Sequence, residues 1–480
     1  MLTISDEDVA QRLRADNPWW AGPVDLSAFP YKLRRRSYYR VIKALLARRV
    51  RRALVLLGAR RVGKTTLLRQ LIGEASVTGQ FGPVLFASVD TPTYSGMPLD
   101  RYLDFFAREC PHEEAGARLV VFDEIQYLND WERHLKDLVD RFPQTSFVAS
   151  GSAGAALKRK SDESGAGRFT DFVLPPLTFA EFIDFSEVNP ALVRDAEPED
   201  RQAVLGFKTD NIAELNRHFI DYINYGGYPE VVTSREVRDD IARTVGRDIV
   251  DKVLLTDLPS LYGIQNIPEL NRLFTMLAFN TGQEVSLDAL SQNSGVAKNT
   301  ISRYIDYLEA AFLIFRVRRL DESARRFVRQ RGFKVYLTNS SMRSALFGPV
   351  SESSRHLGAL VETVAFGQWL HSPELPNLHY ARWAEGEVDI VRLHPATQKP
   401  TWAYDIKWSD RVLERPEEAK AIVLLARSAG LKHVGISATT AQGTLPTDGV
   451  TIRVFPTSLQ CYSLGVRLLD ENAVIQGYEE

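Results

Sequence analysis

Short apolar runs alternate with amphipathic helical patterns over the first third of the chain. Four runs predict strands: 53–58, 83–90, 118–125 and 145–152. Helical patterns at 99–110 and 129–142 lie between them. Such alternation is typical of a parallel sheet with helices on both faces, and ligands of these sheets bind beyond the carboxyl ends of the strands. The pattern therefore predicts an α/β domain with its functional groups at that edge of the sheet.

The pattern changes twice in the remaining chain. Residues 179–259 are mostly helical in periodicity, with breaks at glycines and a proline. Residues 267–320 contain a helical pattern, a shorter one that begins after Ser286, a turn at Gly295, a longer helix and a β-rich run. This order predicts a helix-turn-helix followed by a wing. From about Gly332 the pattern is again mixed α and β.

The turn after the first strand run carries the phosphate-binding loop pattern: Gly58, four residues, Gly63, Lys64 and Thr65. Glycines let backbone N–H groups converge on a phosphate, the lysine reaches the β- and γ-oxygens, and the threonine hydroxyl binds Mg²⁺. The start of the next helix favours the same phosphates. We expect ATP and Mg²⁺ as cofactors. The expected nucleotide-binding residues are Gly58, Arg60, Arg61, Val62, Gly63, Lys64, Thr65 and Thr66.

Two acids, Asp123 and Glu124, follow the apolar run 119–122. At the end of a parallel strand, Asp123 would hold the Mg²⁺ shell with Thr65, and Glu124 would orient and deprotonate the attacking water. Ser150, at the end of the next strand, is a candidate contact to the γ-phosphate or the water. The alternative is an ordinary acid pair at a strand end. The pair predicts hydrolysis, because a nucleotide binder does not need the second acid.

An arginine from a neighbouring subunit can stabilise the transition-state charge of phosphoryl transfer. Arg168 is the first candidate in this chain, and Arg159 and Arg247 compete with it. The alternative is that Arg168 is a solvated loop residue. A residue with this role would require a homo-oligomer.

The second helix of the predicted helix-turn-helix begins with polar residues, where base or phosphate contacts belong. A dense run of arginines follows between 316 and 331. In a protein of formal net charge −2, such a patch is the expected footprint of a phosphate backbone. The candidate DNA-binding residues are Lys298, Asn299, Thr300, Arg303, Arg318, Arg319, Arg325 and Arg326. The alternatives are a protein-interaction module and a salt-bridged linker surface.

The run 401–408 places Asp405 and Lys407 on one face when it is taken with a period of two. The neighbouring predicted strand carries Asp389, and the preceding helix carries Glu362. Three carboxylates can bind Mg²⁺, which would polarise a phosphodiester, and Lys407 would steady the nucleophile or the charged phosphorane. This order resembles the PD-(D/E)XK nuclease pattern, and the helix glutamate is similar to that of Holliday-junction resolvases. The alternatives are a chance Asp-x-Lys match and a domain that only grips DNA.

Composition adds bounds on class and compartment. The chain has 480 residues, which corresponds to about three domains, and 44% hydrophobic residues suit packed cores. Two cysteines, a polar acidic N-terminus and no apolar run of about 18 residues predict a cytoplasmic protein that does not enter a membrane.

The runs GARRVGKTTLL, VVFDEIQYLNDW, ASGSAGAAL, AGRFTDFVLPPLTFAEF and YGGYPEVV follow one another as in a group of prokaryotic AAA-type ATPases that end in a restriction-endonuclease-like domain. The chain resembles this largely uncharacterised group from about Arg34 onward. The resemblance implies an α/β fold with a P-loop AAA-type parallel sheet, a helical lid, a winged helix and a mixed α/β nuclease-like domain. The expected segments are 1–50 (helical lead), 51–180 (ATPase core), 181–262 (lid), 263–322 (winged helix) and 323–480 (nuclease-like domain).

These features together predict an ATPase that acts on duplex or branched DNA as a homo-oligomer, with a hexameric ring as one form. ATP turnover would move the winged helix and the C-terminal domain during remodelling or branch migration in DNA repair or recombination. Two alternatives stay open: a signalling or defence switch that binds protein partners, and a DNA endonuclease licensed by ATP.

Overall fold

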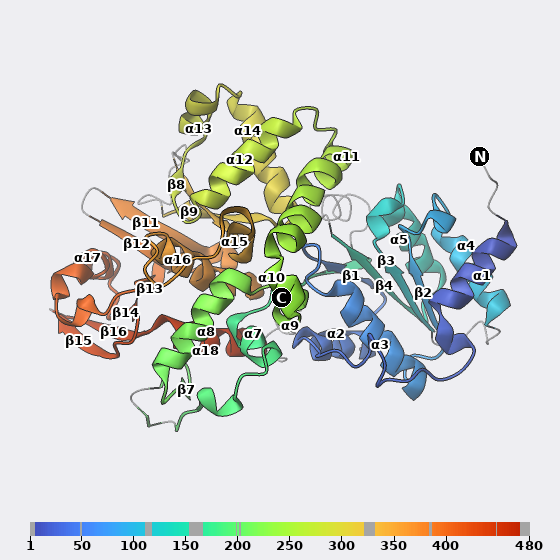
Figure 1. Ribbon diagram of the computed structural model, residues 1–480, viewed down its shortest axis with the longest axis horizontal. Helices are drawn as coiled ribbons and strands as arrows, with labels where there is room; N and C mark the ends of the chain where they lie inside the picture. Colours follow the sequence, from blue (N-terminus) through green and yellow to red (C-terminus); the bar gives the residue numbers. More distant parts are fainter. Residues whose placement is uncertain are drawn as a thin grey trace. The chain divides into compact units, whose positions relative to one another are not determined.

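The computed structural model describes residues 5–48, 50–110, 118–152, 167–197, 199–200, 203–320, 332–383, 386–447 and 449–470. It divides into two compact units (Figure 1). The first comprises Met1–Pro175 with Ala310–Phe312, and the second comprises Pro176–Glu309 with Leu313–Glu480. The finer division into five segments stays a prediction.

The first unit is built on a parallel sheet. Its strands are β1 (Ala53–Leu57), β2 (Val84–Ser88), β3 (Arg118–Asp123), β4 (Thr145–Gly151) and β5 (Phe169–Val173). Their order is β2-β3-β4-β1-β5, and every pairing is parallel. β1 and β3 are buried along their whole length, which explains why both appear in the sequence as continuous apolar runs. The expected parallel α/β sheet is confirmed.

Helices cover both faces of this sheet (Figure 1). They are α1 (Asp6–Asp16), α2 (Tyr38–Ala47), α3 (Lys64–Thr78), α4 (Leu99–Glu109) and α5 (Trp131–Arg141). α1, α4 and α5 share one apolar cluster with alternate residues of the strands, such as Val55 and Leu57 of β1. On the other face, α3 places Arg69 over the Phe86 ring, and Tyr38 of α2 meets Phe172 edge to face.

The second unit contains a nine-stranded mixed sheet in the order β15-β16-β14-β13-β12-β11-β9-β10-β8. The strands are β8 (Glu284–Val285), β9 (Ile314–Arg319), β10 (Phe333–Leu337), β11 (Leu378–Trp383), β12 (Gly386–Leu393), β13 (Pro400–Asp405), β14 (His433–Ala438), β15 (Gly443–Thr447) and β16 (Val450–Pro456). A separate small hairpin pairs β6 (Arg194–Asp195) with β7 (Phe207–Lys208). The strands next to the predicted helix-turn-helix and those of the predicted nuclease-like domain therefore belong to one continuous sheet.

Helical segments of the second unit precede, interrupt and follow its sheet. Those before β8 are α7 (Phe179–Phe185), α8 (Ile212–Tyr225), α9 (Pro229–Thr233), α10 (Arg235–Asp239), the π-helical η5 (Ala242–Asp251) and η6 (Val253–Asp257), α11 (Leu258–Tyr262) and α12 (Ile267–Phe279). Those after it are α13 (Leu287–Ser294), α14 (Lys298–Ala310), α15 (Ser341–Phe347), α16 (Leu357–Gly367), α17 (Lys420–Ala429) and α18 (Thr457–Leu468). Among the described residues, no helix is long and apolar enough to cross a membrane.

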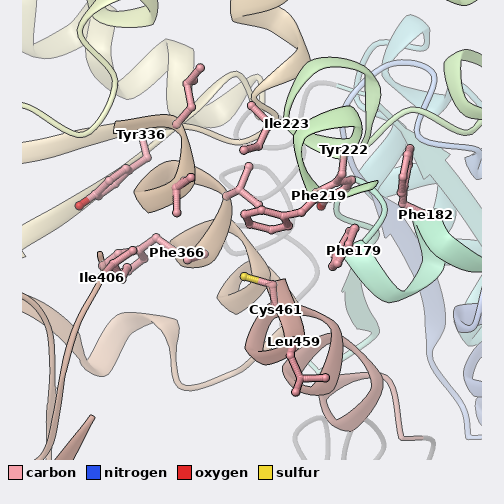
Figure 2. Packing of buried hydrophobic residues seen from close by; sticks show 14 of the residues in the cluster. Phe179, Phe182, Phe219, Tyr222, Ile223, Tyr336, Phe366, Ile406, Leu459 and Cys461 are labelled. Atoms are coloured by element: carbon pink, nitrogen blue, oxygen red, sulfur yellow. The ribbon is translucent and has the colours of Figure 1, made fainter. Parts of the chain in front are cut away.

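The main core of the second unit lies where α7, α8, α16 and α18 meet the sheet. Aromatic side chains fill it: Phe179, Phe182 and Phe219 come from helices, and Tyr336 comes from β10 (Figure 2). Cys461 of α18 is buried in the same cluster as a free thiol. This core holds one face of the sheet and fixes the side chains that the strands present at their ends.

Candidate functional site

The loop between β1 and α3 has the shape that its glycines require. A side chain at Gly58 would place its Cβ 2.5 Å from the carbonyl oxygen of Leu174, so no larger residue fits there without movement. Arg61 and Gly63 adopt positive φ angles of 59° and 98°. This backbone bends the loop tightly around the start of α3, which begins at Lys64. A loop of this kind presents backbone N–H groups to an anion.

Lys64 lies inside this loop. Its Nζ donates hydrogen bonds of 2.9 Å to the carbonyl oxygens of Gly58 and of Ala59. Burial lowers the pKa of Lys64, and the nearby carboxylates of Glu124 and Asp123 oppose that effect. The ammonium is therefore held in the loop by contacts that phosphate oxygens can replace.

The carboxylate of Asp123, at the end of β3, accepts hydrogen bonds from residues of α3 and β4. Thr65 Oγ1 donates to its Oδ2 at 2.7 Å, and Ser150 Oγ donates to its Oδ1. The structure thus places Thr65 beside Asp123, as the sequence predicts, and adds Ser150 as a second partner of this carboxylate. A hydroxyl and a carboxylate at hydrogen-bond distance are hard oxygen donors, so Thr65 and Asp123 fit Mg²⁺ by the chemistry of the pair.

Glu124 has a left-handed backbone with φ of 53°, which is strained for a non-glycine residue. Its Oε2 accepts a hydrogen bond from Gln126 Nε2 and another, of 3.4 Å, from Ser152 Oγ. Burial raises the pKa of Glu124, which suits a group that must take a proton. Gln126 and Ser152 are not among the residues that the sequence predicts for the site, although Gln126 lies only two positions after Glu124.

The other predicted loop residues contribute in different ways. Val62 is fully buried, and its carbonyl oxygen accepts a hydrogen bond of 3.2 Å from Arg36. Arg36 also donates to the Pro175 carbonyl oxygen at 2.7 Å, so this buried arginine braces the loop. Arg60 lies 3.4 Å from the Tyr127 hydroxyl, and Thr66 is half-buried near the start of α3. No sequence pattern predicts this role of Arg36.

The arginine candidates differ in their surroundings. Arg168 Nε donates to Asp140 at 2.6 Å, and Arg51 lies 3.5 Å from the same carboxyl group. Arg168 is thus ion-paired within its own unit. Arg159 lies outside the described residues, and Arg247 is exposed on η5.

The predicted DNA-contacting residues divide into exposed and paired groups. Asn299 and Arg303 of α14 and Arg318 of β9 are exposed, and Thr300 is half-buried. Lys298 forms an ion pair with Asp288, and Arg319 donates to the Arg382 carbonyl oxygen. Arg325 and Arg326 lie outside the described residues. Arg316, a member of the same arginine run, pairs with Asp306 and Glu309.

The C-terminal acids surround a lysine that is not among the residues predicted from the sequence. Lys334 of β10 is almost completely buried, and its Nζ lies 2.6 Å from Glu362 and 3.2 Å from Asp389. It also forms an ion pair with Glu387. The Tyr336 hydroxyl donates to Glu362 at 2.6 Å. An internal ammonium therefore bridges the carboxylates that were expected to share a metal ion.

The remaining acid and lysine of the predicted nuclease pattern lie nearby. β13 ends at Asp405, and Lys407 Nζ lies 3.0 Å from Asp405 Oδ2. Asp389 accepts a hydrogen bond of 2.9 Å from the Ile406 backbone N–H. Burial and the neighbouring Asp389 raise the pKa of Asp405, and burial raises the pKa of Glu362 to about 7. Within the described part of the chain, no three acidic, histidine or cysteine side chains are arranged to hold a metal ion.

A glycine-bearing loop between strand and helix, a buried lysine and a Thr–Asp pair at the carboxyl edge of a parallel sheet define a P-loop nucleotide-binding unit of the ATPase class. Residues 50–183 match the family described as "AAA domain". Residues 216–353 match a domain of unknown function. Most of the first unit is thus similar to AAA domains.

Curated relatives extend the similarity into the second unit. An uncharacterized protein of Haemophilus influenzae is 24% identical over 301 residues, which cover 61% of this chain and 69% of that protein. An uncharacterized protein of Methanocaldococcus jannaschii is 22% identical over 375 residues, which cover 77% and 78% of the two chains. These relatives carry no assigned activity.

Among solved structures, PCH-2 of C. elegans is 16% identical, with a TM-score of 0.27. The similarity covers 41% of this chain and 58% of that one. A TM-score this low informs neither fold nor function.

Proposed function

We propose that this chain is an ATP-hydrolysing, DNA-binding protein in which ATP turnover changes how the second unit holds DNA. The observation that supports hydrolysis is the side-chain arrangement after β3, where Asp123 is bonded to Thr65 and Glu124 is held by Gln126 and Ser152. A phosphate loop alone suffices for binding. A positioned glutamate beside it supplies the base that water attack needs.

The residues would divide the reaction as follows. Backbone N–H groups of the loop bind the β-phosphate, and Lys64 exchanges its carbonyl partners for β- and γ-oxygens. Thr65 and Asp123 would hold Mg²⁺, which neutralises phosphate charge when it is bound. Glu124 takes the proton of the attacking water, the bond between the γ-phosphorus and the bridging oxygen breaks, and ADP and phosphate leave. Ser150 orients Asp123 through its hydrogen bond.

The arrangement of helices and strands in the second unit supports the proposed DNA binding. α13 and α14 follow each other across a short connection, and β8, β10 and β9 form antiparallel pairs beside them, as a winged helix would. The exposed Asn299 and Arg303 lie in the first half of α14. We assign them and Arg318 as the primary contacts to a duplex or branched DNA backbone. The other predicted contacts are Lys298, Thr300, Arg319, Arg325 and Arg326.

We assign the acidic cluster around Lys334 to structure rather than to DNA cleavage. The ammonium lies between Glu362 and Asp389, so a metal ion would have to displace a buried ion pair. The C-terminal part of the second unit would then hold DNA without cutting it. Remodelling or branch migration fits this assignment better than an ATP-licensed endonuclease.

The proposal includes a homo-oligomer, of which a hexameric ring is one form. An arginine from a neighbouring copy would complete the ATP site. Arg168 can serve only if it leaves Asp140, whereas Arg247 is exposed.

A second candidate function is a switch that binds protein partners. The ion pairs of Lys298 and Arg316 favour it, because they leave less positive charge on α14 and β9 than the sequence suggests.

DNA-stimulated ATPase activity separates the two candidates. Phosphate release is measured with and without linear, forked and four-way DNA, in the parent protein and in the double variant Arg303→Ala/Arg318→Ala. The matched control is Arg217→Ala/Arg235→Ala, because both control arginines are exposed on the same unit. The proposal expects stimulation that the first double variant loses and the control keeps. Equal rates with and without DNA would favour the switch.

A further inference from the structure

A cavity of about 460 Å³ lies in the second unit, beside β13, β14 and β16. Its size falls in the range of about 300–1,000 Å³ that small-molecule sites occupy. The cavity is also lined by Val204 and Leu205, which lie between β6 and β7, by the short helix Gln368–His371 and by α18. None of its lining residues belongs to the P-loop, to the Lys334 cluster or to the proposed DNA-contacting set.

The strand register explains why aromatic and basic side chains share this wall. Arg392 of β12 pairs with Trp402 of β13, Tyr404 pairs with Gly435 of β14, and Gly435 pairs with Arg453 of β16. Side chains two positions apart along a strand point to the same face of the sheet. With this register, side chains from one face of β12, β13, β14 and β16 line the cavity.

Gly435 is the one position among these paired residues of the cavity wall that has no side chain. A Cβ at this position would lie 2.8 Å from the Tyr404 ring and 3.3 Å from the Phe455 ring. The Tyr404 and Phe455 rings therefore pack directly against the backbone of Gly435. Any larger residue at position 435 would displace these rings toward the cavity. Because Gly435 of β14 has no side chain, the two rings can lie against this strand and leave the space beside them open.

Three rings of the wall are nearly parallel. Trp402 and Tyr404 have centroids 5.9 Å apart with planes at 16°, and Tyr404 and Phe455 have centroids 5.6 Å apart with planes at 7°. Trp369 stands across them at 65° to Trp402. The Tyr404 hydroxyl donates to Gln460 Oε1, which fixes an amide in the wall. Tyr404 is stacked between its two neighbours and is buried, so the partly buried Trp402 and Phe455 are the rings of this wall that a ligand can reach. Aromatic side chains on a sheet can stack nucleobases.

The rim of the cavity favours an anion. Arg453 is exposed, and its Nη2 makes one long hydrogen bond of 3.4 Å, to the Ala203 carbonyl oxygen. Across the part of the chain that the structure describes, Arg453 has no ion pair. Arg392 is already paired with Glu374 at 2.9 Å, so Arg453 is the cation left for a ligand. An exposed guanidinium next to aromatic rings suits a phosphate attached to a planar base.

We propose that this cavity is a second nucleotide site, which binds a nucleobase against the Trp402–Tyr404–Phe455 wall and its phosphate at Arg453. The ligand is either a free nucleoside monophosphate or an unpaired base of a DNA single strand, because both carry the same group. The inference goes beyond the proposed function and requires neither ATP hydrolysis nor DNA binding by α14.

Calorimetric titration of the full chain tests the site with two probes. The first is a set of nucleoside monophosphates, which lack the phosphates that the P-loop lysine binds, and the second is a short single-stranded oligonucleotide. Each is titrated into the parent, Arg453→Ala, Trp402→Leu and the matched control Arg411→Ala, whose arginine is exposed in the same unit and outside the cavity. Lys64→Ala protein is included as well.

At least one probe should bind, with affinity reduced about tenfold or more by Arg453→Ala and by Trp402→Leu and unchanged by Arg411→Ala. Because Arg453 is exposed at the rim, its substitution should leave the thermal midpoint unchanged. Binding of the monophosphates alone identifies the free nucleotide, and binding of the oligonucleotide alone identifies the DNA base. Lys64→Ala should not change this binding, so loss of ATPase activity and loss of this site are separate results. Failure of both probes to bind at millimolar concentration, or binding that Arg453→Ala leaves unchanged, overturns the proposal.

Discussion

At the scale of single residues, Glu124 concentrates the chemistry of the first unit. Its backbone is strained, its side chain is half-buried, and two neighbours hold its carboxylate. A left-handed conformation at a non-glycine residue costs about 1–3 kcal/mol and persists where the surrounding structure enforces it. Such strain beside a phosphate loop indicates a residue placed for function.

Glu124→Gln should therefore lower the ATP hydrolysis rate by about a hundredfold or more, because it removes the base and keeps the shape. ATP binding should persist, since the loop and Lys64 are intact. Phosphate release and nucleotide titration measure the two properties. Unchanged hydrolysis would remove Glu124 from the mechanism.

Gln126 gives a prediction with a defined sign in pH. Burial raises the pKa of Glu124, and the Gln126 hydrogen bond lowers it by favouring the charged form. A base works when deprotonated, so the rate should fall as pH drops through the raised pKa. Gln126→Ala removes the lowering contribution and should shift the acid limb of the rate profile to higher pH. A shift to lower pH, or none, would show that Gln126 does not tune Glu124.

Loss of Lys334 should strongly destabilise the second unit. Lys334→Met leaves the carboxylates of Glu362, Glu387 and Asp389 without their shared cation, and breaking a buried ion pair costs about 3–5 kcal/mol. Lys407→Met is the matched control, because Lys407 is partly exposed and pairs only with Asp405 among the described residues. Chemical unfolding should show a large loss for Lys334→Met and a small one for Lys407→Met. Equal losses would contradict the central place of Lys334.

At the scale of elements, the loop between β1 and α3 depends on the close approach of Leu174. Gly58→Ala would force its Cβ to within 2.5 Å of that carbonyl oxygen, whereas Gly79→Ala, at another positive-φ glycine of the same unit, meets no atom within 4 Å. We expect Gly58→Ala to weaken ATP binding about tenfold or more. Gly79→Ala should change stability by about 1 kcal/mol and leave ATP affinity alone. Equal affinity in both variants would show that the loop tolerates a side chain.

The elements of the first unit could be predicted because each local rule agrees with the final fold. Fully buried parallel strands appear as apolar runs, and the glycine spacing fixes the loop and the start of α3. The ends of β3 and β4 then bring Asp123 and Ser150 into hydrogen-bond contact. The sequence predicts both residues at strand ends, but it predicts Ser150 as a contact to the γ-phosphate or the water and not to Asp123.

In the second unit, local sequence patterns do not predict which side chains of distant strands come into contact. Lys334 reaches Glu362 and Asp389 only because β10 joins a nine-stranded sheet whose order departs from chain order. The Asp-x-Lys pattern was visible, but the lysine that bridges the acids comes from a distant strand. The same holds for the cavity near Arg453, since its wall depends on register across β12, β13, β14 and β16. Such juxtapositions arise from long-range pairing that periodicity does not encode.

At the scale of the whole molecule, the proposed function requires that a nucleotide bound in the first unit change DNA binding by the second. Linkage makes such coupling reciprocal: if DNA changes the affinity for ATP, then ATP changes the affinity for DNA by the same factor. Coupling of about fivefold or more is typical of such systems. The claim therefore predicts DNA affinity that depends on the bound nucleotide.

DNA affinity measured in different nucleotide states tests this claim most directly. Fluorescent four-way and duplex DNA are titrated with parent and Lys64→Ala protein, each with ADP, with a non-hydrolysable ATP analogue and without nucleotide, at one fixed salt concentration. The account predicts a Kd for DNA that changes about fivefold or more between nucleotide states in the parent and stays constant in Lys64→Ala protein. A Kd that is the same in every state of the parent, or that changes equally in the variant, would contradict it.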